Sequence, residues 1–493
     1  MSLTQATLDL VKSAQSAPDQ NLAKSISTAT GLVAYDLQAP AKNLYPVNTP
    51  IRNIIPRIGG GIGTATNWRV VQQIIGSGFD AMGWVKEGQR SGRMSYQTAN
   101  KSASFVTLGE EDSITHEAIN AGLSFEDLRA TMVLRLLQKM MLKEESALLG
   151  GNASVALGTP VTPTLSAAGS GATLPTATYS VSVVALTYEG HKNSSVAAGV
   201  ATQQVITGAD GNNYTLSGGS SNKSAAATQA ITLGQVLSVS TTAVNGAVAY
   251  AWYVGLAGAE KLEKITTINS ATFTAALAGT GQALSSITAD NSTNTLAYDG
   301  LLSAAFAPSS GAYVRALATG TPGTGTVLTS SGKGSVVEID TMLQSMWDNY
   351  QVSPDQLWVN SQELKNITSK VLNGSSAPLL RFNTSGSDPY AFVANGVVEW
   401  YFNPFHANGG VKMPIKIHPM VPAGTIIGWS GNLPVQYQNS NVPNVAELRV
   451  RKEYHQIDWP LRTRMQEVGV YLEAVLAVYF PAAMGILTNV ADG

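Results

Sequence analysis

The longest helical pattern of the chain covers residues 124–149. Apolar residues recur there at every fourth position, and basic residues are expected on the opposite face. Ser124 is a favourable residue before a first helical turn, and Gly150-Gly151 ends the pattern. A helix of this length spans roughly 39 Å, so we expect it to organise the rest of the chain. The apolar positions include Leu128, Met132, Leu136 and Met140, and the basic ones are Arg129, Arg135, Lys139 and Lys143.

Alternation of small polar and apolar residues precedes this helix. Residues 65–110 contain two such runs around a glycine-rich middle, which predicts a long two-stranded hairpin. A solitary hairpin of this length is marginally stable in water, whereas pairing with another subunit would stabilise it. The charges at its tip are therefore either partners in ion pairs between subunits or solvated loop charges. These charges are Lys86, Glu87, Arg90 and Arg93.

Residues 1–64 contain no long stretch of either pattern. Prolines interrupt helices and restrict the preceding residue to extended conformations. We therefore expect an extended N-terminal arm that buries little of its own surface and either stays free or lies along a neighbouring surface. The prolines that break the pattern are Pro40, Pro46, Pro50 and Pro56.

The composition changes sharply at residues 159–296, which are rich in Ala, Ser, Thr and Gly and carry few charges. Alternating residues recur at 177–190, 247–256 and 261–275, with turn signals such as Asn245-Gly246 between them. Short strands of this kind are typical of a small antiparallel β-sandwich. Because a long helix precedes it and α/β patterns follow it, we expect this sandwich to be an inserted domain.

Mixed α/β patterns return at residues 297–432. Helices are predicted at 336–350 and 361–372, with a short buried strand, QLWVN, between them. Glu363 and Lys365 are expected in the exposed part of the second helix. Further strands are predicted at 396–405, 411–420 and 424–431, and the segment 433–493 adds strands before a compact Pro-Ala-Ala ending.

Composition narrows the possible function classes. The 493-residue chain has no cysteine, which excludes disulfides, thiolate metal sites and a cysteine nucleophile. Its net charge is −2 and only 13% of its residues are charged, where about 25% is usual, so we expect other copies to cover much of the surface. There is no strongly basic tail for tight nucleic-acid binding. The first residues lack the apolar run of a signal peptide, and no run of about 18 apolar residues indicates a membrane span.

No pattern of catalytic or ligand residues stands out. The glycine run at 59–63 lacks the Gly-Lys-Ser/Thr ending of a phosphate-binding loop. A carboxylate cluster at 110–112 would suit a cation, but solvated charges near a helix start are the simpler interpretation. The histidines have no metal-ligand spacing, and Ser430 misses the G-x-S-x-G pattern because Asn432 replaces a glycine. We therefore expect no catalytic, cofactor-binding or metal-binding residues, and no enzymatic activity.

Arg462 and Arg464, in the stretch WPLRTRMQE, form a second group of candidate contact residues. They are expected either to pair with acidic residues of an adjacent subunit or to lie on a solvated strand face.

Taken in order, these parts resemble the major capsid protein of tailed bacteriophages, which has the Hong Kong 97-type capsid fold. The hairpin at 65–108, the helix at 124–149 and the helix–PDQLWVN–helix run at 336–372 carry the resemblance. The end of the chain adds IIGWSGNLPVQYQ, VRKEYHQIDWPLRTRMQEVGVYL and YFPAAMGILTNV. Within the insertion, NGAVAYAWYVG is similar to the central strand region of immunoglobulin-like or fibronectin-like modules appended to phage structural proteins.

The resemblance implies an α+β fold that is divided along the chain into seven parts. These are an N-terminal arm (1–64), an E-loop hairpin (65–110), a peripheral domain with a spine helix (111–158), an inserted Ig-like β-sandwich (159–296), an axial domain (297–432), peripheral-domain strands (433–468) and a C-terminal strand that returns to the axial domain (469–493).

The resemblance also implies a structural function. Many copies would form hexamers and pentamers that mature from a procapsid into an icosahedral head around double-stranded DNA, without sequence-specific binding. The expected location is a virion assembled in the host cytoplasm, with scaffolding, portal and decoration proteins as partners and no membrane or cofactor. Some members of the family crosslink their subunits through Lys–Asn isopeptide bonds. Lys86 and Lys101 lie in the hairpin, but nothing in the sequence marks an acceptor.

Two other interpretations stay open. An encapsulin-like nanocompartment shares the fold and encloses a cargo enzyme instead of DNA. An adhesin or tail component built around the β-sandwich would be a soluble monomer or trimer. This last interpretation leaves the spine helix and the 336–372 run unexplained.

Overall fold

The computed structural model describes residues 46–75, 82–123, 126–208, 211–332, 334–372, 398–406, 409–433, 443–461 and 463–492. Within these residues the helices cover mixed and antiparallel sheets, so the fold is α+β, which confirms the predicted class. Most of the expected N-terminal arm, residues 1–45, lies outside the described residues. No helix of the described part is long and apolar enough to cross a membrane.

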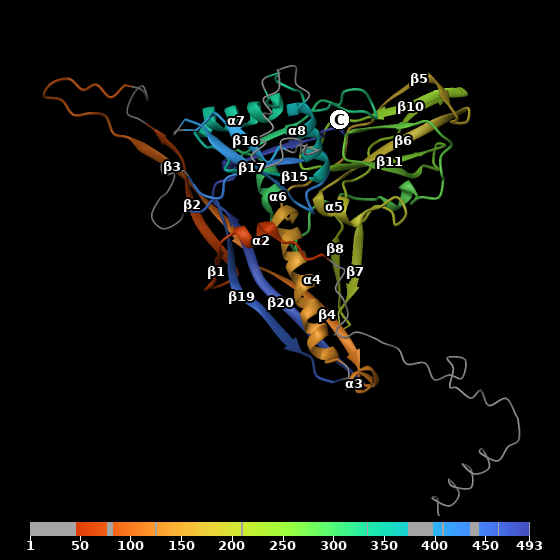
Figure 1. The fold of residues 1–493 in the computed structure, drawn as a ribbon, viewed down its shortest axis with the longest axis horizontal. Helices are drawn as coiled ribbons and strands as arrows, with labels where there is room; N and C mark the ends of the chain where they lie inside the picture. Colours follow the sequence, from red (N-terminus) through yellow and green to blue (C-terminus); the bar gives the residue numbers. More distant parts are fainter. Residues whose placement is uncertain are drawn as a thin grey trace, which may run out of the picture.

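A four-stranded sheet packed against helix α4 (Leu128–Gly150) forms the lower body in Figure 1, which we call the peripheral body. Met132, Leu136 and Met140 of α4 are buried against the apolar positions of the sheet. The short helices α2 (Pro50–Ile54) and α3 (His116–Gly122) lie beside it. In spatial order the strands are β1 (Arg57–Ile58), β19 (Ala446–Asp458), β20 (Met465–Val478) and β4 (Val106–Thr115), antiparallel except for β1 on β19.

The spine helix α4 begins later than its pattern predicted. Asp127 is the N-cap, because its carboxylate accepts hydrogen bonds of 3.1 Å from the backbone N–H groups of Arg129 and Ala130. Ser124, the expected N-cap, lies outside the described residues. The helix ends at Gly150 as expected, and its 23 residues span about 34 Å.

Two of the four basic residues of α4 depart from the face opposite the sheet, which corrects that part of the sequence-based expectation, and the other two are exposed. Arg129 pairs with Asp458 of β19, and Lys143 pairs with Glu110 of β4, so both reach toward the sheet. The outward face also includes Leu134, which is 55% exposed. Long cationic side chains extend past the buried methionines to carboxylates on the strands, which an angular pattern alone does not reveal.

A two-stranded ribbon, β2 (Ala65–Ile75) with β3 (Ser95–Ser104), projects from the peripheral body and extends away from the other elements (Figure 1). The predicted hairpin range of 65–110 is too long. The Phe105 N–H donates to the carbonyl of Thr64 at 2.9 Å and closes the ribbon, and the chain then enters β4 of the peripheral sheet. Alternation continues from one strand into the next, so the sequence pattern does not show this change of sheet.

A six-stranded mixed sheet with helices α7 (Val337–Tyr350) and α8 (Ser361–Leu372) forms the body at the top centre of Figure 1, which we call the axial body. Met342 of α7 packs where Gly428 and Gly485 face each other on paired strands, and a Cβ at either glycine would lie within 3.0 Å of its side chain. In spatial order the strands are β14 (Tyr313–Ala316), β21 (Met484–Thr488), β18 (Ile426–Trp429), β15 (Gln356–Val359), β17 (Val411–Ile417) and β16 (Trp400–Asn403).

The helix–strand–helix run predicted at 336–372 is confirmed by α7, β15 and α8, and β15 is buried along its whole length. The predicted boundary at 468/469 is wrong, because it falls inside β20. The chain returns to the axial body only after β20, through the short helix η4 (Pro481–Ala483) into β21. The helix α6 (Leu301–Phe306) lies between α4 and this ending.

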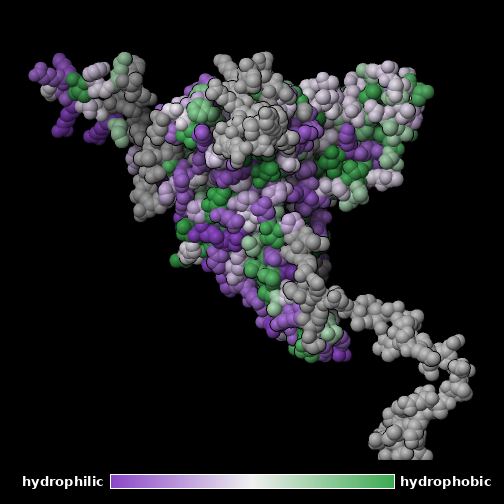
Figure 2. Space-filling view, viewed as in Figure 1, coloured by the Kyte–Doolittle hydropathy of each residue, from purple (hydrophilic) through white to green (hydrophobic). Residues whose placement is uncertain are grey.

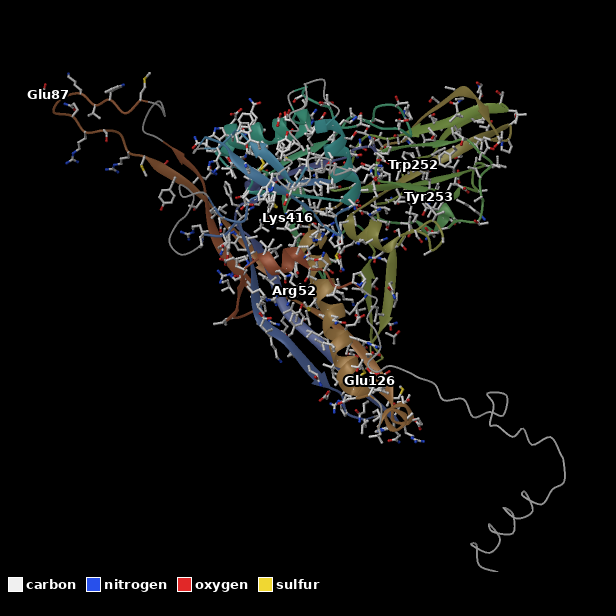
Figure 3. The ribbon with its side chains drawn as sticks, in the orientation of Figure 1. Arg52, Glu87, Glu126, Trp252, Tyr253 and Lys416 are labelled. Atoms are coloured by element: carbon white, nitrogen blue, oxygen red, sulfur yellow. The ribbon has the colours of Figure 1, made fainter. Side chains whose placement is uncertain are left out.

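Two antiparallel sheets between α4 and α6 form a module at the upper right of Figure 1. Their facing sides enclose one apolar cluster, in which Trp252 is fully buried, and Figure 3 shows Trp252 beside Tyr253 inside the module. One sheet contains β13 (Ser270–Phe273), β10 (Gly234–Ser240) and β5 (Thr164–Ala172); the other contains β12 (Lys261–Thr266), β11 (Ala249–Gly255), β6 (Ala177–Leu186) and β9 (Ala227–Ile231).

Two of the alternating runs in the module divide differently from their pattern. The run at 261–275 forms β12 and β13 in different sheets, and the end of the run at 177–190 turns into helix α5 (Tyr188–Asn193). The Thr187 hydroxyl caps α5 by accepting from the Gly190 N–H at 3.2 Å. A short helix, η2 (Leu284–Ser286), covers the second face of the four-stranded sheet, together with Ile287.

Hydrogen bonds of three asparagines fix the module to the axial body and to α6. The Asn269 N–H donates to the Asn489 side chain at 2.7 Å, and Asn489 Nδ2 donates to the carbonyl of Leu317 at 2.7 Å. A third asparagine, Asn245, donates to the carbonyl of Phe306 at 2.9 Å. Asn269 and Asn489 are buried, so water does not reach their polar groups. Losing one of these hydrogen bonds would therefore leave a buried polar group without a partner, which is costly.

Glu363 in the first turn of α8 is fully buried, which corrects the expectation that it lies on the exposed part of the helix. Its carboxylate accepts a hydrogen bond of 3.0 Å from the Gly424 N–H and lies near Asn366. The sequence pattern failed here because the C-terminal segment folds back over α8, where Asn366 donates to the carbonyl of Ala491 at 3.3 Å. Burial raises the pKa of Glu363 to about 7.

We expect Glu363→Gln to remove part of the pH dependence of stability. A raised folded-state pKa adds stability that is present below pH 4.5 and is lost as the pH rises through 7, because the folded chain must then hold a buried charge. Glutamine keeps an oxygen for the Gly424 N–H but never ionises. Urea unfolding from pH 5 to 8 should show the variant gaining on the wild type as the pH rises. The exposed Glu117→Gln is the control, and a constant difference would contradict the assignment.

Candidate assembly surface

The tip of the β2–β3 ribbon presents large apolar side chains to solvent, and Figure 2 shows hydrophobic residues among hydrophilic ones on this projection. Trp84 is 93% exposed, and no part of the described chain packs on it. Figure 3 places Glu87 at the far end of the ribbon, away from both bodies. An exposed group of large apolar side chains on a projecting element is typical of a contact surface for another protein. Among the side chains that the structure describes in this ribbon, the other exposed apolar ones are Met82, Val85, Met94 and Tyr96.

The four charges predicted at the tip, Lys86, Glu87, Arg90 and Arg93, lie together there and are exposed. Among the described residues none of them forms an ion pair. Three are basic and one is acidic, so the tip is cationic, and it suits an acidic surface.

The base of the ribbon is held firmly. The rings of Trp68 on β2 and Tyr479 after β20 meet edge to face, with centroids 5.5 Å apart. The Arg451 guanidinium donates to the carbonyl of Gly63 at 3.0 Å and lies over the ring of Phe105. The ribbon therefore has an anchored base and a free tip.

Arg464 lies far from these charges, immediately before β20. Its guanidinium pairs with Glu117 of α3 at 2.6 Å, and both side chains are exposed. Arg462 lies outside the described residues. The structure thus does not bring Arg464 together with the hairpin charges, and it gives Arg464 a partner within its own chain.

Two adjacent carboxylates of α4, Glu144 and Glu145, are fully buried where the N-terminal segment, the peripheral sheet and the axial body meet. The Glu145 carboxylate accepts hydrogen bonds from the Ile51 and Arg52 N–H groups at 2.9 and 2.7 Å. These N–H groups belong to the first turn of α2, which has no side-chain cap of its own. Glu145 therefore stabilises the beginning of α2 from another element.

Glu145 also binds His418, which follows β17 of the axial body and is fully buried. The distance from His418 Nε2 to Glu145 Oε1 is 2.6 Å. His418 Nδ1 accepts a hydrogen bond of 3.1 Å from the Met420 N–H, so Nε2 carries the proton that Glu145 accepts. One carboxylate thus connects α2, the spine helix and the axial sheet.

Glu144 forms ion pairs with two arginines of the N-terminal segment. Its carboxylate accepts from Arg52 Nε at 2.7 Å and from the Arg57 guanidinium and the Tyr454 hydroxyl. Both guanidinium groups lie over the Tyr454 ring. Figure 3 shows Arg52, a residue of α2, at this junction.

The pKa shifts around Glu144 agree with this pairing. The hydrogen bond from Arg57 lowers the pKa of Glu453, which lies next to the cluster. Burial opposes the charged form of Arg52, but the hydrogen bond and charge of Glu144 outweigh it and raise its pKa. Burial, together with the charge of Glu144, raises the pKa of Tyr454. We call Glu144, Glu145 and the groups that bind them the joint. Its charged groups stabilise one another through these hydrogen bonds and ion pairs.

Sequence reasoning missed this joint, although a signal was present. Glu144 follows Met140 by four residues and precedes Leu148 by four, so it occupies the apolar stripe of the helix. Both carboxylates also lie near the C-terminus of α4, where the helix dipole disfavours negative charge. A carboxylate that breaks both rules indicates buried partners.

The remaining sequence candidates have structural partners. On β4, Glu110 pairs with Lys143, and the Tyr471 hydroxyl donates to Glu111. The Ser430 hydroxyl donates to the carbonyl of Asn432 at 2.9 Å in a turn. Among the described residues no group of three His, Asp or Glu side chains is arranged to hold a metal ion.

No protein-family model matches the chain, and no curated protein matches it. Solved structures with similar folds include the capsid of Myoviridae phage XM1, at 10% identity and TM-score 0.41, over 95% of this chain and 100% of that one. The capsid of a native GTA particle has 9% identity and TM-score 0.44, over 96% and 100%. The holo-SrpI encapsulin complex from Synechococcus elongatus PCC 7942 has 10% identity and TM-score 0.40, over 95% and 97%.

We expect Glu145→Ala to destabilise the chain by about 3–5 kcal/mol, because two N–H groups and a histidine would be left buried without their partner. The matched control is Glu117→Ala, which removes a carboxylate from the exposed pair with Arg464 and should cost less than about 1 kcal/mol. Urea unfolding of the unassembled chain measures both. Equal costs for the two variants would show that the joint contributes no more than a surface ion pair.

Proposed function

We propose that the chain is the major capsid protein of a tailed bacteriophage with the Hong Kong 97-type fold. In this proposal it self-assembles as hexamers and pentamers into an icosahedral head that encloses double-stranded DNA. Assembly would take place in the host cytoplasm, with scaffolding, portal and decoration proteins. Its role is structural, without catalysis and without a cofactor.

The observation that carries the proposal is the β2–β3 ribbon with its anchored base and its exposed apolar tip. In a monomer, Trp84 at 93% exposure on a projecting ribbon contributes no burial energy to folding. A second copy that buries this tip would recover the lost stability. Such a contact is head to tail, because each subunit reaches onto one neighbour and is contacted by another. Head-to-tail contacts close into a ring when the rotation between subunits closes, as a capsid ring requires.

The charges of the chain support contacts between copies. The cationic tip suits the exposed acidic residues around β4 and the start of α4, such as Glu111, Asp112 and Asp127. Figure 3 shows Glu126 at the lower end of the peripheral body, far from the tip of its own ribbon. The two surfaces therefore meet only between copies.

An encapsulin-like nanocompartment shell is the second candidate, because the same ribbon and spine would serve it equally. The content of the particle separates the two, since one shell encloses DNA and the other a cargo enzyme. An adhesin built on the module is the third candidate, and it requires a chain that stays monomeric or trimeric.

Negative-stain electron microscopy after size exclusion tests the proposal. We expect closed polyhedral shells, or rings of five and six subunits, from the purified chain or from the chain expressed with a scaffolding protein. A sharp monomer or trimer peak that persists across salt and protein concentrations, with and without a scaffold, would contradict it.

We expect Trp84→Ser to raise the concentration needed for shell formation by roughly 30-fold, because a buried anchor contributes about 2 kcal/mol or more. Leu256→Ser is the matched control, since Leu256 is also exposed but lies in a turn of the module. Both variants should unfold at the urea concentration of the wild type. Equal assembly of the two variants would show that the hairpin tip is not part of the contact between copies.

A further inference from the structure

A second ribbon, β7 (Gln203–Thr207) with β8 (Asn213–Ser217), leaves the module and runs along the peripheral body (Figure 1). It forms a sheet of two strands only, and most of its residues are exposed. Val205 on β7 is 60% exposed and Tyr214 on β8 is 47% exposed. A two-stranded ribbon has too little buried surface to be stable alone, so this one needs a further strand.

The hydrogen bonds of the ribbon identify the backbone groups that are free. The Gly208 N–H donates to the Asn212 carbonyl at 2.8 Å, and the Gly218 N–H donates to the Thr202 carbonyl at 2.7 Å. Because bonded pairs alternate along an antiparallel ladder, residues 204 and 206 also direct their backbone groups toward β8. The N–H and C=O groups of Gln203, Val205 and Thr207 therefore point away from β8, to an edge that no strand of the described residues pairs with.

The free edge belongs to β7 because β8 is the strand on the side of the body. Tyr214 of β8 lies close enough to Tyr471 of β20 to contribute to the raised pKa of that tyrosine, after the larger effects of burial and Glu111. Figure 1 shows β8 on the side of α4 and β4, with β7 beyond it. The edge of β7 is left facing outward.

The edge of β7 lacks the charged residues and prolines that usually prevent an edge strand from pairing with another chain. Neither β7 (QQVIT) nor β8 (NYTLS) contains a charge or a proline. The open edge of β4, in contrast, carries Glu110, Glu111 and Asp112. An uncharged edge pairs with its own copy without repulsion, whereas a charged one would place like charges opposite each other.

We propose that β7 pairs antiparallel with β7 of a second copy about a twofold axis through Val205. This register pairs Gln203 with Thr207 of the other strand and Val205 with its own copy. All the outward groups are then used, which gives six new backbone hydrogen bonds and a four-stranded sheet. A register centred one residue away uses only two of the three residues. The inference deepens the proposed function, because it supplies a contact between copies besides the hairpin tip.

Cysteine crosslinking tests the pairing, since the wild-type chain has no cysteine. In a bonded antiparallel pair the Cα atoms lie about 5.5 Å apart, which suits a disulfide. Val205→Cys should therefore give a covalent dimer under mild oxidation of the assembled chain. The matched control is Thr215→Cys, because Thr215 lies directly opposite Val205 within the ribbon. Its copies would lie about 14 Å apart across the new sheet, too far to crosslink.

Val205→Lys gives an independent readout, because two lysines would face each other at the axis while the β7–β8 ladder stays intact. It should weaken assembly at low salt more than Thr215→Lys does. Shells that form without a Val205→Cys dimer, or with equal dimer from both cysteine variants, would overturn the pairing and leave the proposed function standing. A wild-type chain that never assembles would instead overturn the proposed function, and a Val205→Cys dimer in that chain would still support the pairing.

Discussion

The buried carboxylates of α4 are the constraint on which the rest of the structure depends. A charge placed in a protein interior is costly unless its partners surround it, so Glu144 and Glu145 fix the positions of every group that binds them. Those groups come from α2, from β19 and from the end of β17, which are far apart in the sequence. The peripheral and axial bodies are therefore locked together at one point, around the last turns of one helix.

A locked joint determines how the extended parts behave. The β2–β3 ribbon is anchored by Trp68 against Tyr479, close to the same peripheral sheet, and the module is fixed to the axial body by Asn269 and Asn489. The contacts therefore hold both extensions at their bases, which lowers the conformational entropy that the extensions lose on binding another surface. In the proposed assembly, this placement would let identical contacts repeat at constant angles.

The sequence predicted the elements better than their partners. The spine helix and the 336–372 run follow from periodicity, because apolar spacing reports directly which face is buried. Periodicity does not report which sheet a strand joins, so the change from β3 to β4 at Phe105 and the division of 261–275 into two strands were not visible. Glu363 shows the same limit for a single residue. A carboxylate is normally exposed, and only the segments that pack on it from elsewhere in the chain make it buried.

The hairpin tip and the edge of β7 differ in chemistry, and that difference assigns them different kinds of contact. A cationic tip with a bulky tryptophan does not fit a copy of itself, so in the proposed assembly it would contact an unlike surface in head-to-tail contacts that can close into rings. An uncharged strand edge fits its own copy, and in the proposed assembly it would form twofold contacts that join one ring to the next. A closed shell needs both kinds of symmetry. A chain that carries one surface that fits only an unlike surface and another that fits its own copy would meet that need without a second type of subunit.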